Sequence, residues 1–132
     1  MFVGNYDAKD TAVIIAGIHI TGFGEDMVSA EKEEDFFTTS VGAQGDVVNS
    51  EINNNLGTVN VTIQRTSPSK AFLLSLAKEQ EPFSLWVINK RLGERKGGTM
   101  ARMVSFPEIT DGAEVEDLEF GFKVFDYTVE AT

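Results

Sequence analysis

Carboxylates are the side chains in this sequence whose number and spacing could do chemistry. There are 21 aspartates and glutamates, gathered most densely at residues 31–35 and 114–117. Paired carboxylates can act as general acid and base or bind a divalent cation, but both tasks need neighbours that tune and position them. Neither run has a histidine or a basic pocket beside it. We therefore expect solvated acidic surfaces, with no metal and no cofactor.

Nucleophiles and soft metal ligands are scarce. The chain has no cysteine and one histidine, His19, which excludes disulfides, a thiol nucleophile and a multi-histidine zinc site. No serine lies in a nucleophile elbow, and the glycines form neither a P-loop nor a dinucleotide-binding motif. His19 is predicted to face the pleat or solvent. The sequence therefore predicts a protein that is not an enzyme.

The size and charge of the chain exclude further classes of protein. The chain has 132 residues and a formal net charge of −10 at pH 7, which suits one domain over residues 1–132. A protein this acidic does not bind nucleic acid or anionic lipid by overall electrostatic attraction. Residues 1–10 lack an export signal, and the longest apolar stretch, 12–20, is too short for a membrane anchor. We expect a soluble protein made in a cytoplasm.

Several segments alternate apolar and polar residues, the pattern of strands with one buried face. The clearest is 59–64, where β-branched residues alternate with polar ones. Further strands are predicted at 83–89, 100–106 and 118–129, the last with a bulge or two buried faces where the alternation changes phase. The first strand is predicted at 13–20, with one face formed by alternate residues: Ile14, Ala16, Ile18 and Ile20.

One helix is predicted at roughly 68–80. Ser67 can cap its first N–H groups and Pro68 suits its first position, while its apolar residues are spaced to cover a sheet; binding a partner is the alternative role. The predicted fold is mostly β (α+β): an antiparallel sandwich or partial barrel of about six or seven strands with one packed helix.

Two connections stand out. Residues 36–56 mix turn formers with β-branched residues and are too long for a simple turn, which predicts an extended hairpin or loop arm. Residues 90–98 are glycine-rich and hold four of the eleven lysines and arginines, which predicts a basic hairpin loop.

The central sequence resembles the tail tube proteins of contractile-tailed bacteriophages. The resemblance rests on the Gly-x-x-Gly-x-Val turn at 42–47, the alternating strand at 58–64, and the Thr-Ser-Pro sequence at 66–68 that leads into an apolar helix. It is firmest over residues 42–77 and looser at both ends.

This resemblance implies a virion structural protein made in a bacterial cytoplasm. Such subunits form hexameric rings whose strands complete a shared β-barrel, and the rings stack into a hollow tube for double-stranded DNA. The implied partners are further copies, a contractile sheath, and tape-measure and baseplate proteins. An acidic lumen would repel phosphates and let DNA slide.

Three sets of residues follow as candidates under this resemblance. The candidate lumen-facing residues are Glu31, Glu33, Glu34, Asp35, Asn60, Thr62 and Gln64. The candidate contacts of the arm with other subunits or rings are Phe36, Phe37, Val41, Val47, Val48, Ile52 and Asn54. The candidate basic contact loop contains Lys90, Arg91, Arg95 and Lys96, facing a neighbouring subunit or the sheath.

Other functions remain open from sequence. A tail terminator or baseplate hub component would form one ring without polymerising. A small acidic module that binds a peptide or sugar would stay monomeric. A small enzyme lacks the acid, base and nucleophile that it would need.

Overall fold

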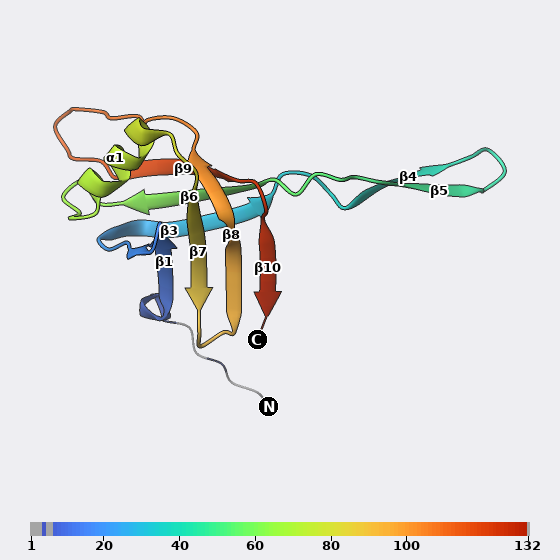
Figure 1. The fold of residues 1–132 in the computed structure, drawn as a ribbon, viewed down its shortest axis with the longest axis horizontal. Coiled ribbons are helices and arrows are strands. Elements are labelled where there is room, and N and C mark those ends of the chain that lie inside the picture. Colours follow the sequence, from blue (N-terminus) through green and yellow to red (C-terminus); the bar gives the residue numbers. More distant parts are fainter. Residues whose placement is uncertain (1–3, 5–6, 132) are drawn as a thin grey trace.

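The chain folds into a body of strands with one helix, from which a two-stranded arm projects (Figure 1). The computed structural model describes residues 4 and 7–131, without the side chains of 25 and 26, so the expectation about residues 1–10 lies largely outside it. The elements are η1 (Ala8–Asp10), β1 (Thr11–Ile15), β2 (Ile18–His19), β3 (Phe23–Lys32), β4 (Phe37–Val41), β5 (Val47–Glu51), β6 (Gly57–Ile63), α1 (Lys70–Glu79), β7 (Phe83–Asn89), β8 (Glu94–Met103), β9 (Leu118–Val124) and β10 (Thr128–Ala131).

Eight of the described strands form one antiparallel sheet. Their order is β2-β1-β7-β8-β9-β6-β3, with β10 added on β8. Strand β8 belongs to both halves of the sheet, because its first part pairs with β7 and β10 while its last residues pair with β9. The sheet curls there, so that β1, β7 and β8 cross in front of β3, β6 and β9 (Figure 1). The predicted partial barrel with one helix is confirmed, and the arm adds a separate two-stranded sheet.

The core lies between the two halves of this curled sheet. Val59, Val61 and Ile63 of β6 are fully buried, as their alternation predicts, and they pair in register with the aromatic side of β9. Phe122 of β9 meets Phe83 of β7 edge to face, with ring centroids 5.9 Å apart. Apolar burial of this extent is the main stabilising term of the body.

Helix α1 covers part of the core with Leu73 and Leu76, which confirms the role predicted for it. It begins at Lys70, two residues later than expected, because residues 65–69 form turns instead. Ser67 Oγ accepts the N–H of Ser69 at 3.1 Å and donates to the carbonyl of Thr21 at 2.6 Å. The helix start is thus tied to the end of the first hairpin.

The prediction of one strand over 13–20 was wrong. Ala16 and Gly17 have positive φ angles of 52° and 80° and form a tight turn between β1 and β2. The turn reverses the chain and moves the buried face to Val13 and Ile15, leaving Ile18 49% exposed. His19 is exposed on β2, as predicted.

The alternation of apolar and polar residues changes phase after Val124 because β9 ends there. This end of a strand is neither the bulge nor the doubly buried strand that the sequence suggested. Asp126 accepts hydrogen bonds from the N–H groups of Thr99 and Met100, both at 3.1 Å. This carboxylate holds the turn between β9 and β10, which pair with the same edge of β8.

Candidate assembly surfaces

The arm is a regular hairpin whose two strands pair only with each other among the described residues. β4 and β5 pair from Phe37 with Glu51 to Val41 with Val47, and the Ile52 N–H extends the ladder to the Phe36 carbonyl at 2.9 Å. Every residue of both strands is exposed. Five large apolar side chains therefore face solvent along it: Phe36, Phe37, Val41, Val47 and Val48. The predicted arm is confirmed as a hairpin; Ile52 and Asn54 are half-buried at its root.

The root of the arm is held firmly by the body. The Tyr127 N–H donates to the carbonyl of Asn55 at 2.9 Å, and the Glu33 N–H donates to the carbonyl of Leu56 at 3.0 Å. The Tyr127 ring also lies against Gly57, where any side chain would collide with it. Burial, and then the nearby charge of Glu31, raises the pKa of Tyr127. These contacts fix the direction in which the arm projects.

A groove of about 660 Å³ runs between this root and β10. Its apolar lining comes from Phe36, Phe37 and Val129, and Lys32 Nζ lies 5.0 Å from the centre of the Phe36 ring. Among the described residues, β10 pairs only with β8. The groove therefore lies beside a strand with one free edge.

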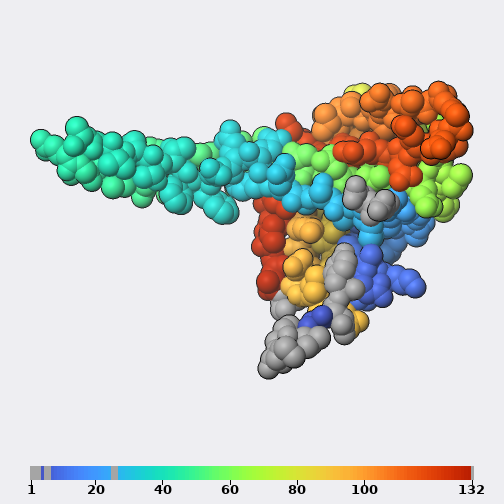
Figure 2. Space-filling view, turned by 180° about the vertical axis from the view of Figure 1, so that it is seen from behind, coloured from blue at the N-terminus to red at the C-terminus, as the bar shows by residue number. Residues whose placement is uncertain are grey.

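The second surface is the polar side of β3, β6 and β9, strands that run across the body when the molecule is seen from behind (Figure 2). Asn60, Thr62 and Glu119 on this side line a cavity together with residues of β1, β7 and β8. Strand register places the residues of this side in rows: Ser29, Asn60 and Gly121; Glu31, Thr58 and Lys123; Thr62 and Glu119. Glu33 joins them, because its carboxylate lies 3.5 Å from Lys123 Nζ and accepts the Thr58 hydroxyl at 3.3 Å. We call this surface the polar face.

The polar face contains four of the seven candidate lumen residues: Glu31, Glu33, Asn60 and Thr62. The structure separates the others from it. Gln64 follows the end of β6, where its N–H donates to the Gly22 carbonyl. Glu34 and Asp35 lie at the arm root, where their carbonyls accept Lys32 Nζ at 2.6 and 3.4 Å.

Sequence reasoning missed four charged or hydroxyl-bearing members of this face: Ser29, Thr58, Glu119 and Lys123. The signal was present, since Glu119, Gly121 and Lys123 alternate with the buried apolar residues of β9. Only the apolar half of that alternation was used. The carboxylates of Glu31, Glu33 and Glu119 outnumber the amine of Lys123 on these strands, and Glu94 and Lys96 beside them are opposite in charge, so the face is acidic.

The basic connection differs from its prediction. Only residues 90–93 form a turn, and Arg95 and Lys96 belong to β8. Arg95 stacks on Trp86 of β7, 3.8 Å above the ring, while Lys96 lines a cavity together with Thr62 and Glu119 of the polar face. Gly97 and Gly98 are needed for close packing against β7 and Asp126, since a Cβ on either would collide. They were mistaken for loop glycines.

Asn89 holds this turn in place. Its buried amide donates to Thr11 Oγ1 at 3.0 Å, and its oxygen accepts the Leu92 N–H at 3.0 Å. Lys90, Arg91 and Leu92 are exposed around it, and Arg91 lies 3.7 Å from Asp10. We call residues 90–95 the basic end of the molecule.

An acidic loop lies at the opposite end, over residues 104–117. It has five carboxylates and no basic residue. Arg65 fixes its middle, donating to the Thr110 carbonyl at 2.9 Å and the Asp111 carboxylate at 2.6 Å. Four apolar side chains of this loop are at least half exposed: Val104, Phe106, Ile109 and Val115.

No chemical centre emerges from the described part of the chain. In that part of the chain, no group of three or more histidine or acidic side chains is placed to hold a metal ion. Among the described helices, none has the length and apolar character needed to cross a bilayer. The features that the fold does build are therefore surfaces.

Comparison with known families assigns the chain. The profile of the bacteriophage PhiTE tail tube protein family matches residues 15–115. The chain belongs to this family. The match includes the arm, strands β3 and β6 of the polar face, α1 and most of the acidic loop. The tail-tube resemblance found in the sequence is confirmed.

Several solved structures share the fold of this chain at low sequence identity. One is the tube-terminating cap of the anti-feeding prophage, with a TM-score of 0.69, 11% identity, and coverage of 100% of this chain and 96% of that one. Another is the PVC sheath/tube terminator of an extracellular contractile injection system, with a TM-score of 0.72, 12% identity, and coverage of 99% and 100%.

A third is the PVC sheath-tube complex in its extended state, with a TM-score of 0.71, 12% identity, and coverage of 97% and 93%. No curated protein sequence matches the chain. At these identities the structures establish the fold alone. This fold therefore occurs in a tube-terminating cap, in a sheath/tube terminator and in a sheath-tube complex.

Proposed function

We propose that this chain is the subunit of a tail tube. Copies form hexameric rings, and the rings stack into a hollow tube through which double-stranded DNA enters the host. The role is structural, without catalysis. The observation that carries the proposal is the arm, whose five large apolar residues are each at least half exposed.

An isolated two-stranded hairpin is marginally stable in water. The arm keeps both its faces exposed, including Phe37 at 50% and Val41 at 67%. A neighbouring subunit that covered it would bury this apolar area and convert the arm into stabilising contact. Because the arm root is fixed by Tyr127 and Asn55, little orientational entropy remains to be lost on docking.

The open sheet gives a second reason for assembly. Strand β3 pairs only with β6 and β10 only with β8, so both offer free edges among the described residues. Free edges of this length promote uncontrolled association unless they are covered. A ring of identical subunits covers them by pairing one copy with the next, as a closed barrel does.

The polar face fits the lining of the tube. Most of its side chains are short or acidic, and Glu31, Glu33 and Glu119 outnumber the lysine on these strands, Lys123. Repulsion of phosphates within the screening distance of about 8 Å would keep DNA from adhering. In this arrangement the sheath surrounds the outside, while the tape-measure protein and the baseplate set the tube's length and starting point.

Electron microscopy combined with sedimentation tests the proposal. We expect the purified chain to form long hollow tubes as its concentration rises. A variant with residues 37–51 replaced by Asn-Gly closes the ladder between Phe36 and Ile52 with a favoured two-residue turn. It should unfold at nearly the wild-type temperature and stay unassembled. A wild-type protein that remains monomeric at every concentration would contradict the proposal, as would an armless variant that assembles normally.

A tube terminator is the second candidate, because a cap and a terminator are among the structures that share the fold. A terminator would appear in the same micrographs as single rings that do not lengthen. A baseplate hub component would give the same picture. An acidic binding module would remain monomeric.

A further inference from the structure

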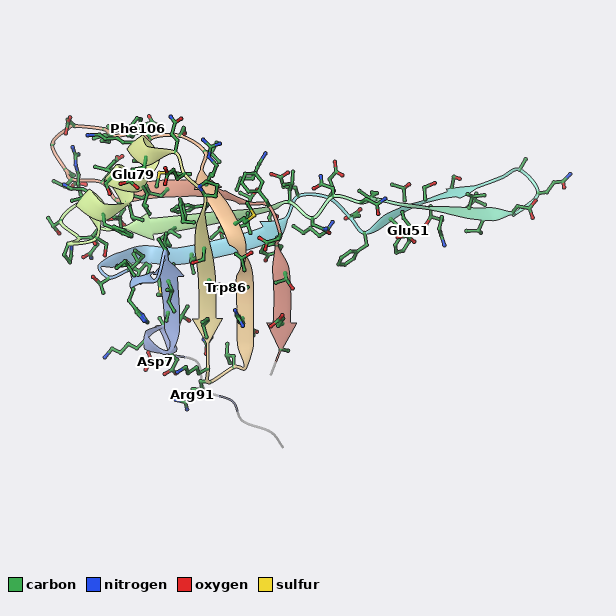
Figure 3. All side chains as sticks on the ribbon, viewed as in Figure 1. Asp7, Glu51, Glu79, Trp86, Arg91 and Phe106 are labelled. Atoms are coloured by element: carbon green, nitrogen blue, oxygen red, sulfur yellow. The ribbon has the colours of Figure 1, made fainter. Side chains whose placement is uncertain are left out.

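The two ends of the body differ in charge. Figure 3 places Phe106 of the acidic loop at one end and Arg91 of the basic end at the other. The acidic loop contributes Glu108, Glu114, Glu116 and Asp117 beyond the carboxylate that Arg65 already pairs. The basic end contributes Lys90, Arg91 and Arg95, with Glu94 and the Asp10 carboxylate, 3.7 Å from Arg91, as the opposing charges. A molecule so polarised favours alignment of one copy's acidic loop with another copy's basic end.

The apolar residues at these ends complement each other as well. Leu92, at the tip of the basic end, is 48% exposed, and Phe106, Ile109 and Val115 are exposed on the acidic loop. Exposed ion pairs alone contribute little each, because solvent and salt screen them. In a contact between these two ends, burial of the apolar side chains supplies the affinity. The opposite charges around them fix the orientation of the two copies.

Both ends are held by the body before any contact forms. Asn89 fixes the turn around Leu92 through two hydrogen bonds of 3.0 Å. Arg65 fixes the acidic loop at Thr110 and Asp111. Their preorganisation lowers the entropy lost on contact.

We propose that residues 104–117 of one copy dock on residues 90–95 of a second copy, acidic loop to basic end. The contact is heterologous, with different surfaces on its two sides, so it propagates from copy to copy. It rests on the proposed tube function and adds a specific contact to it. Neither the arm nor the free strand edges take part.

Charge exchange tests this contact. In the first variant, Lys90→Glu and Arg91→Glu make both ends acidic; in the second, Glu108→Lys, Glu114→Lys and Glu116→Lys change the formal charge of the loop from −5 to +1. Each variant alone should raise the critical concentration for assembly by about tenfold or more, which corresponds to about 1.4 kcal/mol. An equimolar mixture should assemble, because each variant supplies the end that the other now complements.

Two controls complete the experiment. A chain with all five substitutions exchanges the signs of the two ends, loop basic and residues 90–95 acidic, and should assemble like the wild type. Lys70→Glu with Lys78→Glu repeats the first variant's charge change on α1 and should assemble normally. If wild-type protein assembles and both charge-exchanged variants assemble equally well, the contact is refuted while the tube function stands. If wild-type protein never assembles, the tube function itself fails.

Discussion

Tyr127 lies with its ring directly against the backbone of Gly57, at the point where the arm leaves the body. The same tyrosine donates its N–H to the carbonyl of Asn55 at 2.9 Å. One residue of the turn before β10 therefore fixes the strand that returns from the arm. The arm's projection depends on this packing more than on the hairpin itself.

Gly57→Ala should destabilise the protein and disturb the arm. Its methyl group would displace the Tyr127 ring, and overpacking of this kind costs about 1–3 kcal/mol. Gly121→Ala is the matched control on the neighbouring strand, where the nearest atom to the new Cβ is Asn60 Oδ1 at 3.4 Å. Thermal unfolding should show a clear loss for the first variant and a small change for the second. Equal losses would show that Tyr127 does not set the cost.

Asp126 should give the protein part of its stability above acid pH. Partial burial raises the pKa of this carboxyl, but hydrogen bonds from the Thr99 side chain and from backbone N–H groups outweigh it, and the pKa is lowered from 3.8. Because the folded pKa is the lower one, the contribution is complete above the unfolded value and is lost as the pH falls through the folded value.

Unfolding temperatures measured from about pH 6 to about pH 2 test this linkage. Asp126→Asn should destabilise the protein at the upper end and lose part of the acid-side decline. Asp46→Asn, at the exposed tip of the arm, should retain the wild-type profile. A decline that persists unchanged in Asp126→Asn would assign it to other carboxylates.

Asn89→Ala should loosen the basic end. It removes the acceptor for the Leu92 N–H and the donor to Thr11, and a lost hydrogen bond at a buried site costs about 1–3 kcal/mol. Asn89→Asp retains the acceptor and should keep the turn in place while losing the donor. Amide exchange at residues 90–93 distinguishes the two variants. Equal exchange in both would mean that the Leu92 bond is not what holds the turn.

Glu31→Lys with Glu119→Lys should make assembled tubes hold DNA. Both residues lie on the polar face, so lysines there would neutralise phosphates inside the tube. Tubes assembled with DNA present should protect about tenfold more DNA from nuclease, with protection falling as salt rises. Glu79→Lys with Glu81→Lys makes the same charge change near α1 and should protect none. Equal protection by both pairs would place the polar face outside the lumen.

The sequence predicted best those elements whose geometry follows from their own pattern. Val59, Val61 and Ile63 alternate without interruption, and their strand is buried as expected. The helix was placed within two residues, because Pro68 and the apolar spacing limit it. The arm was foreseen from turn-forming residues at 42–46 and the lack of a helical period.

The errors occurred where tertiary contacts decide. Ala16 looks like part of a β-branched strand, but it adopts φ 52° in a turn that closes β1 on β2. Gly97 and Gly98 resemble loop residues, yet they lie within β8 where its backbone approaches Leu85 and Asp126. The acidic loop and basic end could not be related from sequence, because their positions depend on how the sheet curls.

A cryo-electron microscopy reconstruction of the concentrated protein tests the central claim most directly. The account predicts a hollow tube of stacked rings, with each arm covered by another copy and with Glu31, Asn60 and Thr62 facing the bore. Isolated monomers with exposed arms would contradict it, and so would a filament whose bore is lined by another face of the sheet.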